Sequence, residues 1–262
     1  MASQAKGKSK AYNLLNSEDV LSTLNCLKKL GTKINFKKNY CEIIGLGLNS
    51  FDYKKNLTLN VGNSGTLGRL ILGLLIHCPH KVKLIGDKSL SKRDFSRVIK
   101  PLNFFGVKIR SKKNKLPLIL QGTNYLRPIN FVEKKGSAQV KSCIMLASLN
   151  TPGITKIKCV RSRDHSERIF KHLKIPIKVK NISKINQLIE IKGKKQYNGF
   201  NYNIPGDISS AAFFIVLTCL SKNSKIIIKN VNINKSRTGI IDILKKMNVN
   251  IKIKNKKLIN NE

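Results

Sequence analysis

Three apolar segments of the chain open with small or polar residues: 63–66 (NSGT), 136–139 (GSAQ) and 206–210 (GDISS). A helix N-terminus presents unpaired N–H groups and partial positive charge, and small side chains let an anion approach it. If repeated units pack around a common axis, these N-termini converge on one anion-binding site. Ordinary capping explains any one of them alone. Asp207 would repel an anion, so we expect it to cap its helix or to form a corner between domains.

Arginine is the second group that suits anionic ligands, since its planar fork matches carboxylate and phosphate oxygens. Taken singly, each arginine is an ordinary surface cation. The arginines that lie in or near predicted helix starts are Arg69, Arg93, Arg97, Arg161, Arg163 and Arg168.

Acidic residues are few, 13 in all, and several fall in the predicted first turn of a helix. A carboxylate is favoured there by the helix dipole and by free N–H groups. These residues are Glu18, Asp19, Asp94, Asp164, Glu167 and Asp207.

Other constellations are weak. Residues 77–80 (HCPH) lack a second cluster that would complete a metal site, and we expect His165 to have a structural or substrate-facing role. The sequence has no phosphate-binding P-loop, dinucleotide fingerprint or nucleophile elbow. The residues therefore predict no metal and no cofactor.

The elements that carry these residues repeat. Amphipathic helices end near Gly31, Gly106, Lys174 and Asn248, at spacings of 75, 68 and 74 residues. More apolar helices begin near Gly65, Ala138 and Ser210, at spacings of 73 and 72 residues. The two markers agree on a unit of about seventy residues that reads strand–helix–strand–helix–strands, with the apolar helix inside. We expect strands at 225–229 (KIIIK) and 251–254 (IKIK), and a kink or shortening of one helix at Pro101.

Both ends of the chain fall within a unit. Residues 2–8 (ASQAKGK) resemble the end of an inner helix, and the chain stops after one outer helix and one strand. We expect a fragment of a larger repeat protein, with a complete short protein as the alternative.

The formal net charge is +38, yet 41% of residues are hydrophobic, which excludes a disordered basic tail. The lysines are dispersed and often stand beside Ile and Val. This pattern indicates compositional drift in an AT-rich genome rather than a nucleic-acid-binding surface, which remains the alternative.

The longest apolar stretches, such as 211–220, are too short to span a membrane and predict buried helices. The six cysteines are expected to be small core residues in a reducing compartment. With no signal-type N-terminus, we expect a cytoplasmic protein.

Motifs along the whole chain resemble the 5-enolpyruvylshikimate-3-phosphate (EPSP) synthase family. They are residues 13–30 (NLLNSEDVLSTLNCLKKL), 61–70 (VGNSGTLGRL), 86–102 (GDKSLSKRDFSRVIKPL), 136–142 (GSAQVKS), 160–169 (VRSRDHSERI), 205–214 (PGDISSAAFF) and 237–244 (RTGIIDIL). The resemblance implies an α/β fold of two inside-out, barrel-like domains, each of three βαβαββ units. Residues 1–204 would form a substrate-binding domain with an incomplete first unit, and 205–262 would begin the second domain.

The resemblance also implies transfer of the carboxyvinyl group of phosphoenolpyruvate to the 5-hydroxyl of shikimate 3-phosphate, with release of phosphate and no cofactor. Phosphoenolpyruvate would meet Gly65, Arg93, Gln139 and, with less direct contact, Arg69. Shikimate 3-phosphate would meet Ser137, Ala138, Gln139 and Arg163. Asp94 stands where many relatives have proline.

The N-terminal Lys-Ser…Arg segment of relatives and their acid–base residues have no counterpart here, so little activity is expected of the isolated chain. Self-association and a complementing segment stay open. The sister enolpyruvyl transferase that acts on UDP-N-acetylglucosamine fits less well, because its Cys-bearing loop is absent. A non-catalytic remnant is a further alternative.

Overall fold

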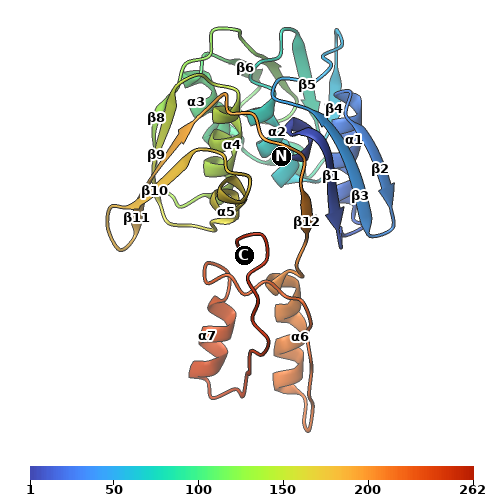
Figure 1. Ribbon diagram of the computed structural model, residues 1–262, viewed down its shortest axis with the longest axis vertical. Helices are drawn as coiled ribbons and strands as arrows, with labels where there is room; N and C mark the ends of the chain where they lie inside the picture. Colours follow the sequence, from blue (N-terminus) through green and yellow to red (C-terminus); the bar gives the residue numbers. More distant parts are fainter.

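The computed structural model describes residues 1–262, and three four-stranded sheets of identical topology form its upper part (Figure 1). In each sheet the first two strands are parallel and the other two join antiparallel. The first sheet holds β12 (Asn201–Asn203), β1 (Lys6–Tyr12), β3 (Tyr40–Leu46) and β2 (Lys33–Lys37). The second holds β4 (Thr58–Asn60), β5 (Lys81–Ile85), β7 (Leu118–Gln121) and β6 (Lys108–Ser111). The third holds β8 (Asn130–Glu133), β9 (Ile154–Val160), β11 (Asn186–Lys192) and β10 (Ile177–Asn181).

The helices complete the repeat. Inner helices α2 (Gly65–Leu74) and α4 (Ala138–Leu149) each follow the first strand of a sheet, and a 3₁₀ turn, η1 (Ala2–Gln4), takes that place before β1. Outer helices are α1 (Glu18–Lys29), α3 (Ser96–Phe104) and α5 (His165–His172), and a short 3₁₀ turn, η2 (Leu90–Lys92), precedes α3. The order β4-α2-β5-α3-β6-β7, repeated from β8 to β11, confirms the predicted βαβαββ unit.

The core lies between the inner helices and the sheets. It contains 41 buried apolar residues from all three units, so residues 1–204 share one core rather than three. α2 and α4 approach closely because Gly73 carries no side chain: a Cβ there would lie 2.3 Å from the carbonyl oxygen of Cys143.

The predicted ends of the outer helices have one backbone conformation. Gly31, Gly106, Lys174 and Asn248 have φ of +83°, +102°, +54° and +62°. A left-handed residue just after a helix ends it and turns the chain toward the next strand. This shared conformation confirms the equivalence of the four positions.

A second repeated device lies where the last strand of each unit crosses the end of an inner helix. A Cβ on Gly45, Gly122 or Gly193 would lie 2.3, 2.4 and 1.9 Å from the nearest backbone oxygen. The oxygens facing Gly45 belong to Ala2 and Ala5. The turn at residues 2–5 therefore occupies the place of an inner-helix end, as the sequence predicted.

The first unit is completed from far along the chain. Its opening strand is β12, which pairs in parallel with β1, Lys10 opposite Asn201. The sequence predicted that this unit lacked its first strand; the strand is present but comes after the third unit. Residues from the start and end of the upper part are thereby held side by side.

The acidic residues occupy helix starts in most of the predicted places. Glu18 and Asp19 lie in the first turn of α1, and Asp164 and Asp207 are the N-cap residues of α5 and of α6 (Ile208–Leu220). Asp94 lies before α3 and accepts the N–H of Ser96 at 3.0 Å. Glu167 lies in the first turn of α5, as predicted, and is also buried in an ion pair with Lys141. Helix α3 continues through Pro101 to Phe104.

Residues 205–262 correct several predictions. They form helices α6 and α7 (Gly239–Lys246) below the sheets but no strand, so the strands expected at 225–229 and 251–254 are wrong (Figure 1). A strand needs a ladder of partners, and here an isolated bridge from Gly206 to Val231 is formed. Without a sheet to cover it, α6 exposes its apolar side chains, including Phe213 at 79% and Leu220 at 80%.

The same exposure explains Cys219, which is exposed on α6, whereas the other five cysteines are buried. α6 begins at Ile208, within the predicted start 206–210, and Asp207 caps it as expected. None of the helices combines the length and apolar character needed to cross a bilayer.

Candidate functional site

The N-termini of α2 and α4 are joined by a network of polar side chains. Gln139 accepts a hydrogen bond from Arg69 Nη1 at 3.1 Å and donates to Thr66 Oγ1 at 2.9 Å. Arg69 Nη1 also donates to the carbonyl oxygen of Gly65 at 3.1 Å, and its guanidinium lies 5.1 Å from the ring centre of Phe95. The network holds the two predicted anion-binding helix starts next to each other.

Arg93 reaches the same place from the loop after β5. A Cβ built on Gly65 would lie 2.9 Å from Arg69 Nη1 and 3.3 Å from Arg93 Nη1, so both guanidinium groups face this glycine. Asp87 orders the loop by accepting the N–H of Leu90 at 2.6 Å and the side-chain amide of Asn63 at 2.5 Å. These two hydrogen bonds lower the pKa of the Asp87 carboxyl.

Glu133 fixes the backbone just before α4 by hydrogen bonds. This carboxylate is buried at the end of β8, accepts the N–H groups of Ser137 at 2.9 Å and Lys135 at 3.2 Å, and pairs with Arg97 at 3.0 Å. Ser137 caps the helix by accepting the N–H of Val140 at 3.4 Å. Ser137, Ala138 and Gln139 remain partly exposed, so a ligand can reach them.

Arg163 comes from the loop between β9 and α5. Its side chain is exposed and makes no hydrogen bond or ion pair within the chain. Its carbonyl oxygen accepts a hydrogen bond from Lys141 Nζ on α4 at 2.8 Å. The loop is thereby attached to α4, although the Arg163 side chain itself contacts none of the other candidate residues.

Carboxylates separate the arginines into two groups. Arg97, Arg168 and Arg237 pair with Glu133, Asp164 and Asp207. Arg69, Arg93 and Arg163, the three that the sequence placed at substrate, form no ion pair, and neither do Arg110, Arg127 and Arg161, which lie outside the candidate site.

Arg69 and Arg93 also lie close enough to repel each other. Burial, followed by the charges of Arg93 and Arg97, lowers the pKa of the Arg69 guanidinium. An anion bound between Arg69 and Arg93 would relieve this repulsion. The electrostatics of the site therefore favour a negatively charged ligand.

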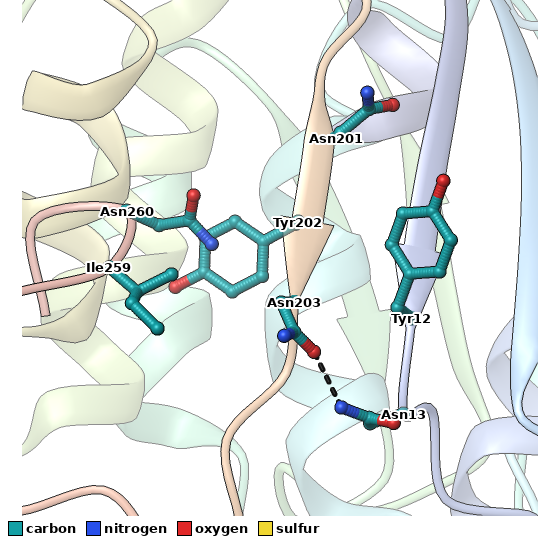
Figure 2. A pocket seen from close by; sticks show the side chains of 7 residues that line it. All are labelled: Tyr12, Asn13, Asn201, Tyr202, Asn203, Ile259 and Asn260. Carbon is teal, nitrogen blue, oxygen red and sulfur yellow. Dashed lines mark hydrogen bonds between the residues drawn. The ribbon is translucent and has the colours of Figure 1, made fainter. Parts of the chain in front are cut away.

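A pocket of about 480 Å³ lies elsewhere, at the junction of β1 and β12 with the C-terminal residues (Figure 2). Its lining includes Tyr12 and Tyr202, with Asn13 Nδ2 donating to Asn203 Oδ1 at 2.5 Å. No charged side chain lines this pocket, so it does not suit a phosphorylated ligand and we place the candidate site at the helix N-termini.

Comparison with known proteins identifies the family of the chain. The family model described as EPSP synthase (3-phosphoshikimate 1-carboxyvinyltransferase) matches residues 1–262. The chain belongs to the EPSP synthase family. This assignment favours the shikimate branch over the sister enzyme that acts on UDP-N-acetylglucosamine.

Individual members of the EPSP synthase family show how far the likeness extends. The chain is 44% identical to the 3-phosphoshikimate 1-carboxyvinyltransferase of Vesicomyosocius okutanii, over 100% of this chain and 59% of that protein. It is 41% identical to the enzyme of the same name from Bacillus cytotoxicus, over 93% and 56%. An EPSP synthase structure from Acinetobacter baumannii superposes with a TM-score of 0.87 at 32% identity, over 99% of this chain and 58% of that one. The chain thus spans under two thirds of the length of these family members.

Some residues of the site were not predicted from the sequence. Glu133 and Lys141 anchor the predicted residues, yet each stands alone among ordinary strand or helix residues. Thr66 belongs to the predicted helix start 63–66, but its hydrogen bond to Gln139 was not predicted. Lys141 has one signal, because a lysine in an otherwise apolar helix needs a buried partner.

Replacing Gly65 with alanine tests the geometry at α2. The new Cβ would displace Arg69 Nη1, which is the end of a flexible side chain, so stability should change little. The methyl group would occupy the space in front of both guanidiniums, and we expect phosphoenolpyruvate to bind about tenfold more weakly. Calorimetric titration measures the affinity and thermal melting the stability. Unchanged affinity would show that the ligand does not approach this glycine.

Proposed function

We propose that this chain binds phosphoenolpyruvate and shikimate 3-phosphate for the 3-phosphoshikimate 1-carboxyvinyltransferase reaction. In that reaction the carboxyvinyl group passes to the 5-hydroxyl of shikimate 3-phosphate and phosphate leaves. The observation that supports the proposal best is the set of unpaired arginines around two adjoining helix N-termini, in a chain of this family. Both substrates are anions that such groups recognise.

The proposed roles follow the geometry. Phosphoenolpyruvate lies over Gly65, between Arg69 and Arg93, where two guanidiniums face the same space. The 3-phosphate of the other substrate accepts hydrogen bonds at Ser137 and Ala138. Gln139, already bonded to Arg69 and Thr66, lies where the two ligands meet.

Arg163 binds shikimate 3-phosphate from the β9–α5 loop. Its guanidinium is exposed and has no carboxylate partner, so it is available to a phosphate or carboxylate. We assign the substrate-binding domain to residues 1–204 and the start of a second domain to 205–262.

We also propose that the isolated chain binds better than it catalyses. General acid–base catalysis needs a group free to exchange a proton with the substrate. The carboxylates near the site are occupied: Asp87 by Leu90 and Asn63, Asp94 by Ser96, and Glu133 by Arg97 and two backbone N–H groups. The hydrogen bonds to Asp87 and Asp94 lower the pKa of both carboxyls, which makes them weak bases beside the positive charge of the site.

Phosphate release tests the proposal. With both substrates present, the chain alone should release phosphate at the background rate. Mixed with a polypeptide that supplies the remaining part of the Bacillus cytotoxicus relative, it should release phosphate in a substrate-dependent way. Arg93→Ala should abolish that release. Full turnover by the chain alone would contradict the proposal that the isolated chain binds the substrates better than it catalyses their reaction. Absence of phosphate release in the mixture would contradict the proposed transferase reaction.

A further inference from the structure

A buried ion pair joins α4 to α5. Lys141 Nζ lies 2.6 Å from Glu167 Oε1, and the side chains are 1% and 5% exposed. Gln187 on β11 donates a second hydrogen bond to the same oxygen at 3.2 Å. Neither charged residue faces the substrates, so the proposed function assigns them no role.

Lys141 makes one more contact, and it leads to the site. Its Nζ donates to the carbonyl oxygen of Arg163 at 2.8 Å, while its own backbone N–H bonds the carbonyl oxygen of Ser137. A second tie beside it joins Ser142 Oγ to Ser166 Oγ at 2.6 Å. The Lys141 side chain thus links α4, the helix that Ser137 caps, to the backbone of Arg163.

Stability alone does not explain this arrangement. Desolvation of two charges offsets most of their attraction, and an apolar pair of similar size is often as stable or more so. Glu167 Oε2 is buried without a hydrogen-bond partner, which adds a further cost. An apolar pair cannot, however, donate a hydrogen bond to the Arg163 carbonyl.

We propose that Lys141, with Glu167 holding its charge in place, is a positioning residue that fixes Arg163 relative to the phosphate-binding start of α4. The proposal rests on the proposed function, since it needs shikimate 3-phosphate to bridge these two places. Arg163 is exposed and otherwise free, so a fixed backbone is what limits where its guanidinium can reach.

The test replaces both charges at once. Lys141→Met alone would leave Glu167 buried and unpaired and would destabilise the fold. The double variant Lys141→Met/Glu167→Leu keeps the volume and removes both charges, so it should melt near the unmodified temperature. It should bind shikimate 3-phosphate about tenfold more weakly and phosphoenolpyruvate unchanged.

Combining the double variant with Arg163→Ala in a mutant cycle distinguishes positioning of Arg163 from a general loss of structure at the site. If Lys141 acts through Arg163, the double variant should weaken binding no further once Arg163 is alanine. The matched control is Lys156→Met/Glu190→Gln, a partly exposed pair at 3.2 Å between β9 and β11 that should change nothing.

Each outcome decides the proposal. Unchanged affinity in a folded double variant, additive losses with Arg163→Ala, or equal loss for phosphoenolpyruvate would overturn the positioning role. Absence of shikimate 3-phosphate binding by the unmodified chain would instead contradict the proposed function, and the positioning role with it.

Discussion

Replacing Arg93 with alanine is expected to weaken the binding of phosphoenolpyruvate about a hundredfold while leaving the fold intact. Arg93 is exposed and forms no ion pair, so its removal leaves no partner unsatisfied. The ligand would lose a charge-assisted, two-pronged contact that Arg69, held by Gly65 and Gln139, cannot replace. Calorimetric titration with phosphoenolpyruvate measures the effect.

Lys92 provides the matched control for Arg93. It is the neighbouring exposed cation, and Lys92→Ala removes the same charge from the same loop. We expect its affinity to stay within about twofold, since a surface charge contributes little. Equal losses in the two variants would show that general positive potential, rather than the Arg93 fork, attracts the ligand.

Gly193→Ala is expected to cause the largest loss of stability, about 3 kcal/mol or more. A Cβ there would lie 1.9 Å from the carbonyl oxygen of Thr151 and 2.2 Å from that of Ser148. These oxygens belong to the backbone at the end of α4, which cannot move aside without breaking core contacts. Chemical denaturation followed by circular dichroism measures the loss.

Gly239→Ala is the control for Gly193→Ala. Apart from its chain neighbours and its own helix backbone, no atom lies within 4 Å of a Cβ at Gly239 in α7, and alanine is the better helix former. Its stability should be equal to that of the unmodified chain or slightly higher. A Gly193 variant as stable as the Gly239 variant would mean that the strand does not cross the helix end as closely as described.

The sequence predicted those parts of the fold that depend on local pattern. The ends of outer helices were readable because glycine, lysine or asparagine follows an amphipathic run, and all four positions take a left-handed conformation. The starts of α2 and α4 were readable because a serine cap and small residues precede an apolar run. The family motifs added the arginines that would meet substrate.

Contacts between residues far apart in the chain could not be predicted from local sequence patterns. Nothing in residues 201–203 indicates that they pair with β1, some 190 residues earlier. The roles of Glu133 and Lys141 depend on which strand end and which loop the topology brings beside them. The prediction that α6 is buried was wrong for a related reason. Its apolar composition indicates that another element packs against it, but composition does not show whether residues 205–262 form that element.

Titration of the unmodified 262-residue chain with shikimate 3-phosphate at physiological salt tests the central claim most directly. We expect saturable binding at one site per chain, weakened by Arg163→Ala and by removal of the 3-phosphate from the ligand. Heat at the level of buffer dilution would contradict it. Binding that duplex DNA outcompetes, with a steep salt dependence, would also contradict it. That result would favour the alternative in which the net charge of +38 serves to bind nucleic acid.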